Sequence, residues 1–238
     1  MPAVDAHEGR LAAADPEACR VLRGAGPSTE AVQTLEELIT GHRAQLTVYQ
    51  NAALAGRYET LVRNVQQREK AVGGGEKLTK TVARSLFKLM AIKDEYEVAR
   101  LYTDGRFMAA LASQFEGNIK LDFYMAPPSI ARSTDGEAPR KIRLGAWMMP
   151  AMRWLARGKL LRGTVLDVFG HTTERRLERQ LVEQFLARID ELLLQLTPDK
   201  LNRVIDIAAL PLSMRGFGHV KLANVALARA REAELLHR

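Results

Sequence analysis

Five polar side chains, from Lys93 to Glu97, interrupt a segment that is otherwise rich in apolar residues. In a helix, Lys93 and Glu97 stand at positions i and i+4, and Asp94 and Glu97 share a face at i and i+3. A buried charge is costly unless it is paired. Lys93, Asp94, Glu95, Tyr96 and Glu97 therefore form a first candidate site, a polar cluster at a ligand or subunit boundary.

The alternative for this cluster is an internal lattice of ion pairs that supports the packing of neighbouring helices. Charges at helical spacing usually pair with each other, which favours this structural alternative. The basic side chains available for such pairing on the same helix are Arg84, Lys88 and Arg100. In that case the cluster stabilises the fold and binds no ligand.

A second candidate is the motif RGFGHVK, which spans Arg215–Lys221 between two expected helices. Its glycines, Gly216 and Gly218, allow the backbone to bend, and the N-terminus of the following helix offers unpaired N–H groups. Arg215, His219 and Lys221 would then complete an anion-binding site. The alternative is a tight turn between helices whose charges lie in solvent, because the motif matches no recognised phosphate-binding fingerprint.

Positive charge is concentrated in one segment of the chain. Six of the seven net positive charges come from residues 132–162, where only Asp135 and Glu137 are acidic. A localised basic patch suits one anionic ligand or partner, and Arg140, Lys141 and Arg143 are candidate anion-binding residues. The alternatives are nucleic-acid binding and a solvated or domain-facing surface. The basic residues of the segment are Arg132, Arg140, Lys141, Arg143, Arg153, Arg157, Lys159 and Arg162.

The sequence carries no recognisable catalytic or metal-binding motif. Its single cysteine, Cys19, excludes an internal disulfide, a four-cysteine zinc site and iron–sulfur ligation by this chain alone. The histidines are far apart and lack the HxxxH or HExxH spacing of zinc sites. No serine, cysteine or aspartate lies in the sequence context of a nucleophile. We therefore expect no catalytic residue, no metal ligand and no cofactor bound by this chain.

The elements that must position these groups begin with the segment Leu78–Thr103, which lacks proline and glycine. Its apolar residues form two adjacent stripes at three-to-four-residue spacing, so nearly every side of a helix would be covered by neighbours. The sequence predicts one continuous central helix over this whole segment.

Further helices are predicted on both sides of the central one. The first runs from about residue 29 to residue 71, where Ser28 or Thr29 provides the cap and Gly41 or Gly56 marks a bend. The others cover residues 106–116, 146–157, 172–196, 198–211 and 219–237.

Two stretches with alternating apolar and polar residues, 118–126 and 141–144, predict a small antiparallel hairpin. A lone hairpin is marginal in water, so it must lie on helices. The expected fold class is mainly α, a multi-helix domain around a central buried helix with one small antiparallel β-hairpin.

The N-terminal segment, residues 1–28, ends in a linker that contains Gly24, Gly26 and Pro27. We place the helical domain at residues 29–238 and treat residues 1–28 as a poorly determined lead-in. The chain shows no secretory signal and no run of about 18 uninterrupted apolar residues. A cytoplasmic location without membrane contact is therefore expected.

Several blocks of this sequence resemble, in the same order, the C-terminal region of the long-chain indolepyruvate ferredoxin oxidoreductases. The resemblance covers roughly Gly9 to Leu236. It includes YQNAALAGRYETLV, and the GRLAAADPEA of the lead-in is similar to the tail of the preceding domain. The clearest blocks are LFKLMAIKDEYEVARLYT, QFEGNIKLDFYMAPP, RGTVLDVFGHTTERRLER and RGFGHVKLANVALARAREAEL.

This resemblance implies a function that the residues alone do not. Enzymes of that family use thiamine diphosphate and iron–sulfur clusters to decarboxylate aryl 2-oxo acids oxidatively, with CoA as co-substrate and ferredoxin as electron acceptor. This chain has no GDG diphosphate motif and one cysteine. It would therefore be a C-terminal accessory domain, either a fragment or a separately encoded piece, that is inactive by itself.

The partners implied by the resemblance are the remaining domains or subunits of the oxidoreductase, and ferredoxin through the whole enzyme, with a homodimer as a further option. The alternative from another class is a stand-alone basic helical module that binds nucleic acid or another polyanion. No nucleic-acid recognition motif accompanies the charge, and the resemblance spans the whole chain. Nucleic acid is accordingly the less favoured partner.

Overall fold

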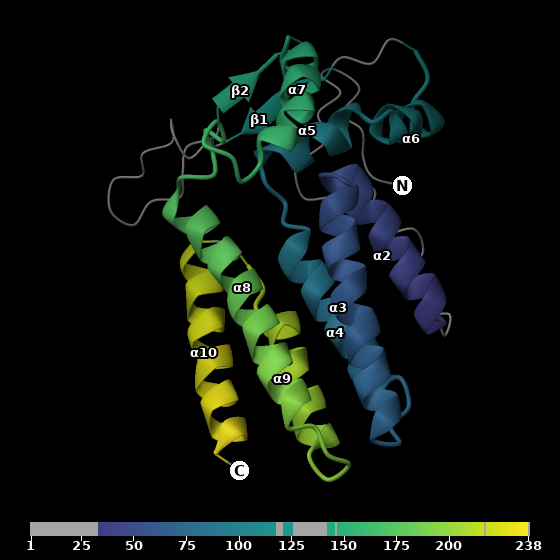
Figure 1. Ribbon diagram of the computed structural model, residues 1–238. Coiled ribbons are helices and arrows are strands. Elements are labelled where there is room, and N and C mark those ends of the chain that lie inside the picture. The colour runs from purple at the N-terminus through teal and green to yellow at the C-terminus, as the bar shows by residue number, and fades with distance from the viewer. Residues whose placement is uncertain (1–32, 118–120, 126–141, 146, 217, 238) are drawn as a thin grey trace. The chain divides into compact units, whose positions relative to one another are not determined.

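The computed structural model describes residues 33–117, 121–125, 142–145, 147–216 and 218–237 (Figure 1). They fall into two compact units. The larger unit combines the segments on either side of the smaller one, Ala31–Asp94 and Lys159–Arg238, and the smaller unit contains Glu95–Gly158.

The larger unit is built from helices alone among its described residues. Helices α2 and α3 form a hairpin, and the glycine-rich turn 73–75 leads from α3 into α4. Helices α8, α9 and α10 follow one another in the C-terminal part of the chain (Figure 1). The bounds are α2 Leu35–Tyr49, α3 Ala52–Ala71, α4 Lys77–Met90, α8 Thr173–Leu194, α9 Leu201–Ser213 and α10 Gly218–Leu236.

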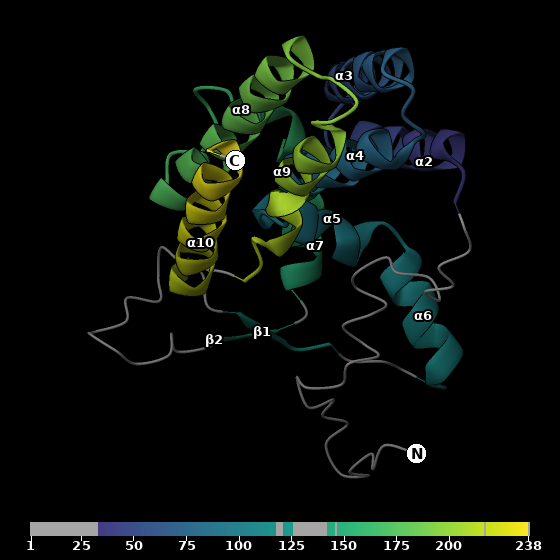
Figure 2. The same ribbon diagram turned by 90° about the horizontal axis from the view of Figure 1, so that it is seen from below.

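Helix α4 is the centre of this unit. It contacts α2, α3, α8 and α9, and Figure 2 shows α9 between α4 and α10. Leu78, Val82 and Leu86 of α4 are fully buried, and they belong to one apolar core with Leu46 and Tyr58 from α2 and α3. The mainly α fold around a central buried helix is thus confirmed.

The central helix is shorter than the sequence predicts. Helix α4 ends at Met90, four non-helical residues follow, and α5 begins at Glu95. No proline or glycine marks this break, which is why helix propensity misses it. The reason is tertiary, because the buried carboxylate of Asp94 lies in the break and pairs with an arginine from another part of the chain.

The helix predicted over residues 29–71 is two helices. They meet at Gln50 and Asn51, where the Asn51 side chain caps α3 by accepting a hydrogen bond from the Leu54 N–H at 2.9 Å. Gly41 and Gly56, the expected bend positions, both lie inside helices. Thr34 forms a capping box with Glu37 at the start of α2, while the expected caps, Ser28 and Thr29, lie outside the described residues.

The described residues of the smaller unit form a two-stranded sheet and three helices. Strands β1 (Phe123–Met125) and β2 (Ile142–Leu144) pair antiparallel, with Phe123 opposite Leu144, which confirms the predicted hairpin. Helix α5 (Glu95–Thr103) packs against α7 (Met148–Arg157), and α6 (Arg106–Gln114) follows α5. Ala99, Phe123 and Met152 form its buried core.

The remaining helix predictions hold to within a few residues. Thr172 caps α8 by accepting a hydrogen bond from the Arg175 N–H, as the sequence suggests. Pro211 lies inside the last turn of α9, close to its end at Ser213. Among the described residues, every helix is too short or too polar to cross a membrane.

Candidate functional site

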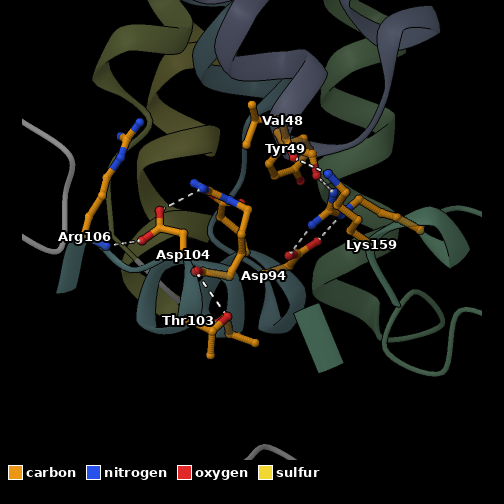
Figure 3. A network of polar contacts seen from close by, with 11 residues as sticks. Val48, Tyr49, Asp94, Thr103, Asp104, Arg106 and Lys159 are labelled. Carbon is orange, nitrogen blue, oxygen red and sulfur yellow. Dashed lines mark hydrogen bonds and ion pairs between the residues drawn. The ribbon is translucent and has the colours of Figure 1, made fainter. Parts of the chain in front are cut away.

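A buried charged pair of the larger unit joins Asp94 to Arg162. The Arg162 Nε and Nη2 atoms donate to the two Asp94 carboxylate oxygens at 2.5 and 2.8 Å (Figure 3). Only 4% of the Asp94 side chain and 10% of the Arg162 side chain are exposed. A bidentate guanidinium–carboxylate pair of this kind combines charge with fixed geometry, so it holds the chain before α5 to the turn that carries Arg162.

The same turn also closes the C-terminal end of α2. Arg162 Nη1 donates to the Tyr49 carbonyl at 2.8 Å, and its guanidinium stacks 3.8 Å from the centre of the Tyr49 ring. Lys159 Nζ donates to the neighbouring Val48 carbonyl at 2.6 Å (Figure 3). Cations suit this position because the last carbonyls of a helix lack partners and carry partial negative charge.

A second buried carboxylate, Asp167, organises the loop that follows. Asp167 is 3% exposed, and its carboxylate accepts hydrogen bonds from the Gly163 and Gly170 N–H groups at 2.9 and 3.0 Å. Any side chain at Gly170 would clash with this carboxylate. Arg179 of α8 donates to the Gly170 carbonyl at 2.7 Å, which fixes the loop to the start of α8.

The predicted cluster from Lys93 to Glu97 does not form a single site. Lys93 is exposed, and the charge that compensates the buried Asp94 is that of Arg162. The backbone from Ala91 to Asp94 is not helical, so the assumed i, i+4 geometry is absent. Glu95 is half-buried and Tyr96 is 4% exposed, the latter lying against Gly158 in the smaller unit.

Glu97 takes part in an internal ion pair, which is the alternative stated above for the cluster. It pairs with Arg100 at 2.7 and 2.8 Å, and Arg100 also donates to Asp104 at 3.1 Å. Asp104 accepts a hydrogen bond from the Arg106 N–H at 3.0 Å at the start of α6 (Figure 3). The hydrogen bond to Glu97 raises the pKa of Arg100 above its usual range. The contacts of Asp104 with Arg100 and Arg106 connect α5 to the start of α6, so this chain of pairs is structural.

Lys88, another expected member of the ion-pair lattice, has a different role. Its Nζ donates to the carbonyls of Pro211 and Leu212 at 2.8 Å, at the C-terminal end of α9. Burial, together with the positive charges of Arg215 and Lys221, lowers the pKa of Lys88. The lysine therefore fastens α9 to the central helix.

The RGFGHVK motif joins α9 to α10: Arg215 and Gly216 lie after α9, and residues 218–221 are the first residues of α10. Gly216 and Gly218 have φ angles of +94° and +54°, which other residues rarely adopt. Lys221 pairs with Glu178 of α8, and the Arg215 carbonyl accepts a hydrogen bond from Asn224 at 2.8 Å. Arg215 and His219 are exposed. The proposed anion site stays a prediction, and its Lys221 is engaged by a carboxylate.

Among the described basic residues of this segment, Arg143, Lys159 and Arg162 are engaged by protein groups, whereas Arg153 and Arg157 are exposed. Arg143 pairs with Asp122 across the hairpin at 2.7 Å. Lys159 and Arg162 bind carbonyls and a carboxylate as described above. The other two candidate residues of this segment, Arg140 and Lys141, lie outside the described residues.

A cleft of about 480 Å³ lies among α4, α8, α9 and α10. Its floor is apolar, with Leu89, Phe185 and Met214 among the lining side chains. On its rim, Arg188 pairs with both Glu232 and Glu191 at 2.6 and 2.5 Å. The rim charges thus neutralise one another, and the cleft defines no chemical class of ligand.

Glu69, in the last turn of α3, is a fully buried carboxylate that none of the predicted sites includes. Its oxygens accept hydrogen bonds from the Leu78 N–H, the Thr79 N–H and the Thr79 hydroxyl at 2.9, 2.9 and 2.6 Å. Glu76 stands at the usual cap position of α4 and makes no capping bond. Glu69 therefore caps α4 from another helix, which no local sequence pattern signals.

His42 of α2 is half-buried against aromatic side chains of α3 and α4. Its ring stacks on Phe87 with centroids 4.0 Å apart, and its Nδ1 shares a 2.8 Å hydrogen bond with the Tyr58 hydroxyl. Burial, helped by the positive charge of Arg84, lowers the pKa of His42 from 6.5 to about 4. The side chain is therefore neutral in the folded protein at physiological pH.

This shift predicts an acid-sensitive fold. The unfolded chain takes up a proton at His42 near pH 6.5, whereas the folded chain takes it up only near pH 4. Stability from this residue is therefore complete above pH 6.5 and is lost as the pH falls towards 4, by about 3 kcal/mol in total. We expect urea denaturation of the His42→Gln variant to show a weaker decline over this interval than the unsubstituted chain. Parallel curves would contradict the assignment.

The residues of this chain do not fit thiamine diphosphate or an iron–sulfur cluster, the cofactors that the resemblance implies. A four-cysteine iron–sulfur cluster needs more ligands than the single Cys19 provides, and the sequence has no GDG motif for a diphosphate. Among the described residues, no three histidine, cysteine, aspartate or glutamate side chains are grouped so that they could hold a metal ion. No reaction step is therefore assigned to this chain.

Together these features define a class of protein: a mainly helical domain whose buried charges serve to hold its segments together. Residues 35–234 match the family described as a family of unknown function, DUF6537, and the chain belongs to this family. No curated protein and no solved structure matches the chain.

Proposed function

We propose that this chain is the accessory domain of a thiamine diphosphate- and iron–sulfur-dependent indolepyruvate:ferredoxin oxidoreductase. The sequence blocks described above support this proposal, since they resemble that enzyme family in order and over most of the chain. In this role the domain contributes no cofactor ligand. It acts through the polypeptide that carries the thiamine diphosphate and the clusters.

The observation that carries the proposal is the contact among Tyr49, Asp94 and Arg162 in the larger unit. These residues belong to three separate resembling blocks, YQNAALAGRYETLV, LFKLMAIKDEYEVARLYT and RGTVLDVFGHTTERRLER. The blocks are far apart in sequence, yet they meet at one buried ion pair. The resemblance therefore includes residues that depend on each other in space, as expected when two proteins share a domain.

Polyanion binding by a stand-alone module gains little support. Nucleic-acid affinity depends on cations that are able to neutralise phosphates. Arg143, Lys159 and Arg162 of the basic segment are instead engaged by groups of the protein itself. We therefore do not propose this function.

The proposal predicts that the purified chain alone binds neither thiamine diphosphate nor iron and does not reduce ferredoxin. Co-expressed with the thiamine- and cluster-bearing polypeptide of the same organism, the tagged chain should retain that polypeptide on affinity purification. The retained complex should reduce ferredoxin when indolepyruvate and CoA are supplied. Failure to retain the polypeptide, or ferredoxin reduction by the chain alone, would contradict the proposal.

A further inference from the structure

Helix α10 forms one wall of the apolar cleft described above, and it packs directly against α9 (Figure 2). Of its 19 residues, Val225, Ala228 and Leu235 are buried, whereas the 13-residue α9 buries five residues. An element that buries few apolar side chains opens at a lower free energy than the core of its protein. Helix α10 is therefore held to the larger unit less firmly than α9 is.

Polar side chains bridge α10 to α8 along the cleft, from the beginning of α10 to near its end. The side chains of the two ion pairs among them are between 12 and 32% exposed. Ion pairs that solvent reaches contribute modestly to stability, and salt screens them. The bridges therefore close the cleft without locking it. They are Lys221–Glu178, Arg229–Gln184 at 3.0 Å and Glu232–Arg188 at 2.6 Å.

One of these bridges leaves a polar atom unsatisfied. The Oε1 atom of Glu178 accepts a hydrogen bond from Lys221, but the Oε2 atom is buried and has no hydrogen-bond partner among the described residues. A buried acceptor without a partner destabilises the arrangement that buries it. Parting α10 from α8 would expose this oxygen to water, which offsets part of the cost of breaking the bridge.

The backbone at the start of α10 is suited to a hinge. Gly216 and Gly218 have φ angles of +94° and +54°, and a Cβ at Gly216 would come within 2.7 Å of the Val220 side chain. Hinges are a few residues at the end of an element whose φ and ψ angles absorb a rotation, and glycine accepts the widest range of these angles. The two glycines therefore allow α10 to turn about its first residue.

We infer that α10 is a hinged wall of the cleft, which turns about Gly216 and Gly218 and is held closed by its polar bridges to α8. Leu89, Phe185 and Met214 belong to the apolar floor. Turning α10 outward widens the cleft and gives an uncharged apolar molecule access to that floor. This inference goes beyond the proposed function, because it concerns the chain alone and requires no oxidoreductase partner.

The first test is hydrogen exchange of the full chain at low, non-denaturing urea concentrations, measured by mass spectrometry. We expect amides throughout α10 to exchange together, about tenfold faster than those of α4 relative to their intrinsic rates. The rates in α10 should depend little on urea, because its rotation exposes less surface than global unfolding. Equal protection in α10 and α4 would overturn the inference. So would protection that rises steadily from Leu236 towards Gly218, which is the signature of a fraying end.

The second test locks the cleft at its rim. In the variant Cys19→Ser/Arg188→Cys/Glu232→Cys, a short bismaleimide joins α8 to α10. The matched control is the same variant treated with N-ethylmaleimide, which modifies both thiols without joining the helices. Joining the helices should bring the exchange of α10 close to that of α4. It should also remove most of the binding of Nile red, an uncharged apolar dye.

Equal dye binding by the joined and unjoined forms would overturn the inference, because access to the floor would then not depend on α10. Unchanged exchange of α10 on joining would overturn it as well. The exchange measurement on the unsubstituted chain decides the inference even if the cysteine variant does not fold. Neither test involves the cofactor-bearing polypeptide, so failure of the hinged wall and failure of the proposed function are distinguished.

Discussion

Replacing Asp94 with alanine is expected to lower the free energy of unfolding by about 3–5 kcal/mol, the usual cost of removing one partner of a buried ion pair. Arg162 would keep its bond to the Tyr49 carbonyl and its position over the Tyr49 ring, but would lose both bonds to the carboxylate. Its charge would then be buried without a counter-charge from Asp94. Urea denaturation followed by circular dichroism measures the loss.

The matched control for this prediction is an exposed pair of the same geometry. Arg57 binds Glu183 through two nitrogens, and the two side chains are 49% and 63% exposed. Glu183→Ala should cost at most about 1 kcal/mol, because solvent screens the pair. The double variant Asp94→Ala/Arg162→Met should be more stable than Asp94→Ala, since it removes the uncompensated charge. Equal losses at Asp94 and Glu183 would contradict the structural role of the buried pair.

The apolar periodicity of the sequence was sufficient to predict most of the fold. It predicted the buried stripes of α4, the strong face of α8 and the alternating residues of the hairpin, because these depend on local spacing. It failed at Ala91–Asp94, where a continuous helix was expected. The break depends on Arg162, 68 positions away, and no local pattern contains that information.

The candidate site also depends on contacts between residues that are far apart in sequence. Asp94 was selected correctly as a charge that needs a partner, but its partner was sought on the same helix, whereas Arg162 lies in another part of the chain. Arg162 was assigned to a basic patch for an anionic ligand, whereas it compensates a carboxylate of the chain itself. The pattern Gly163, Asp167, Gly170 was the available signal for the loop, since aspartate near glycines often bonds the backbone of a turn.

Replacing Glu69 with alanine is expected to cost about 3 kcal/mol of stability. The Leu78 and Thr79 N–H groups and the Thr79 hydroxyl would lose their acceptor while Thr79 stays buried. The first turn of α4 would also lose the negative charge that its partial positive charge favours. Because α4 is the central helix, the loss should appear as global unfolding at lower urea concentration.

Glu76→Ala provides the control at the same end of α4. Glu76 occupies the cap position without a capping bond and pairs with Lys80 at 3.0 Å in a partly exposed geometry. Removing it should cost about 0.5 kcal/mol or less. Glu69→Gln should fall between the two alanine variants, because an amide keeps one acceptor oxygen but places an NH₂ group against the remaining donors. If Glu69→Ala and Glu76→Ala were equally mild, the N–H groups of Leu78 and Thr79 would have another acceptor, and Glu69 would not be the cap of the central helix.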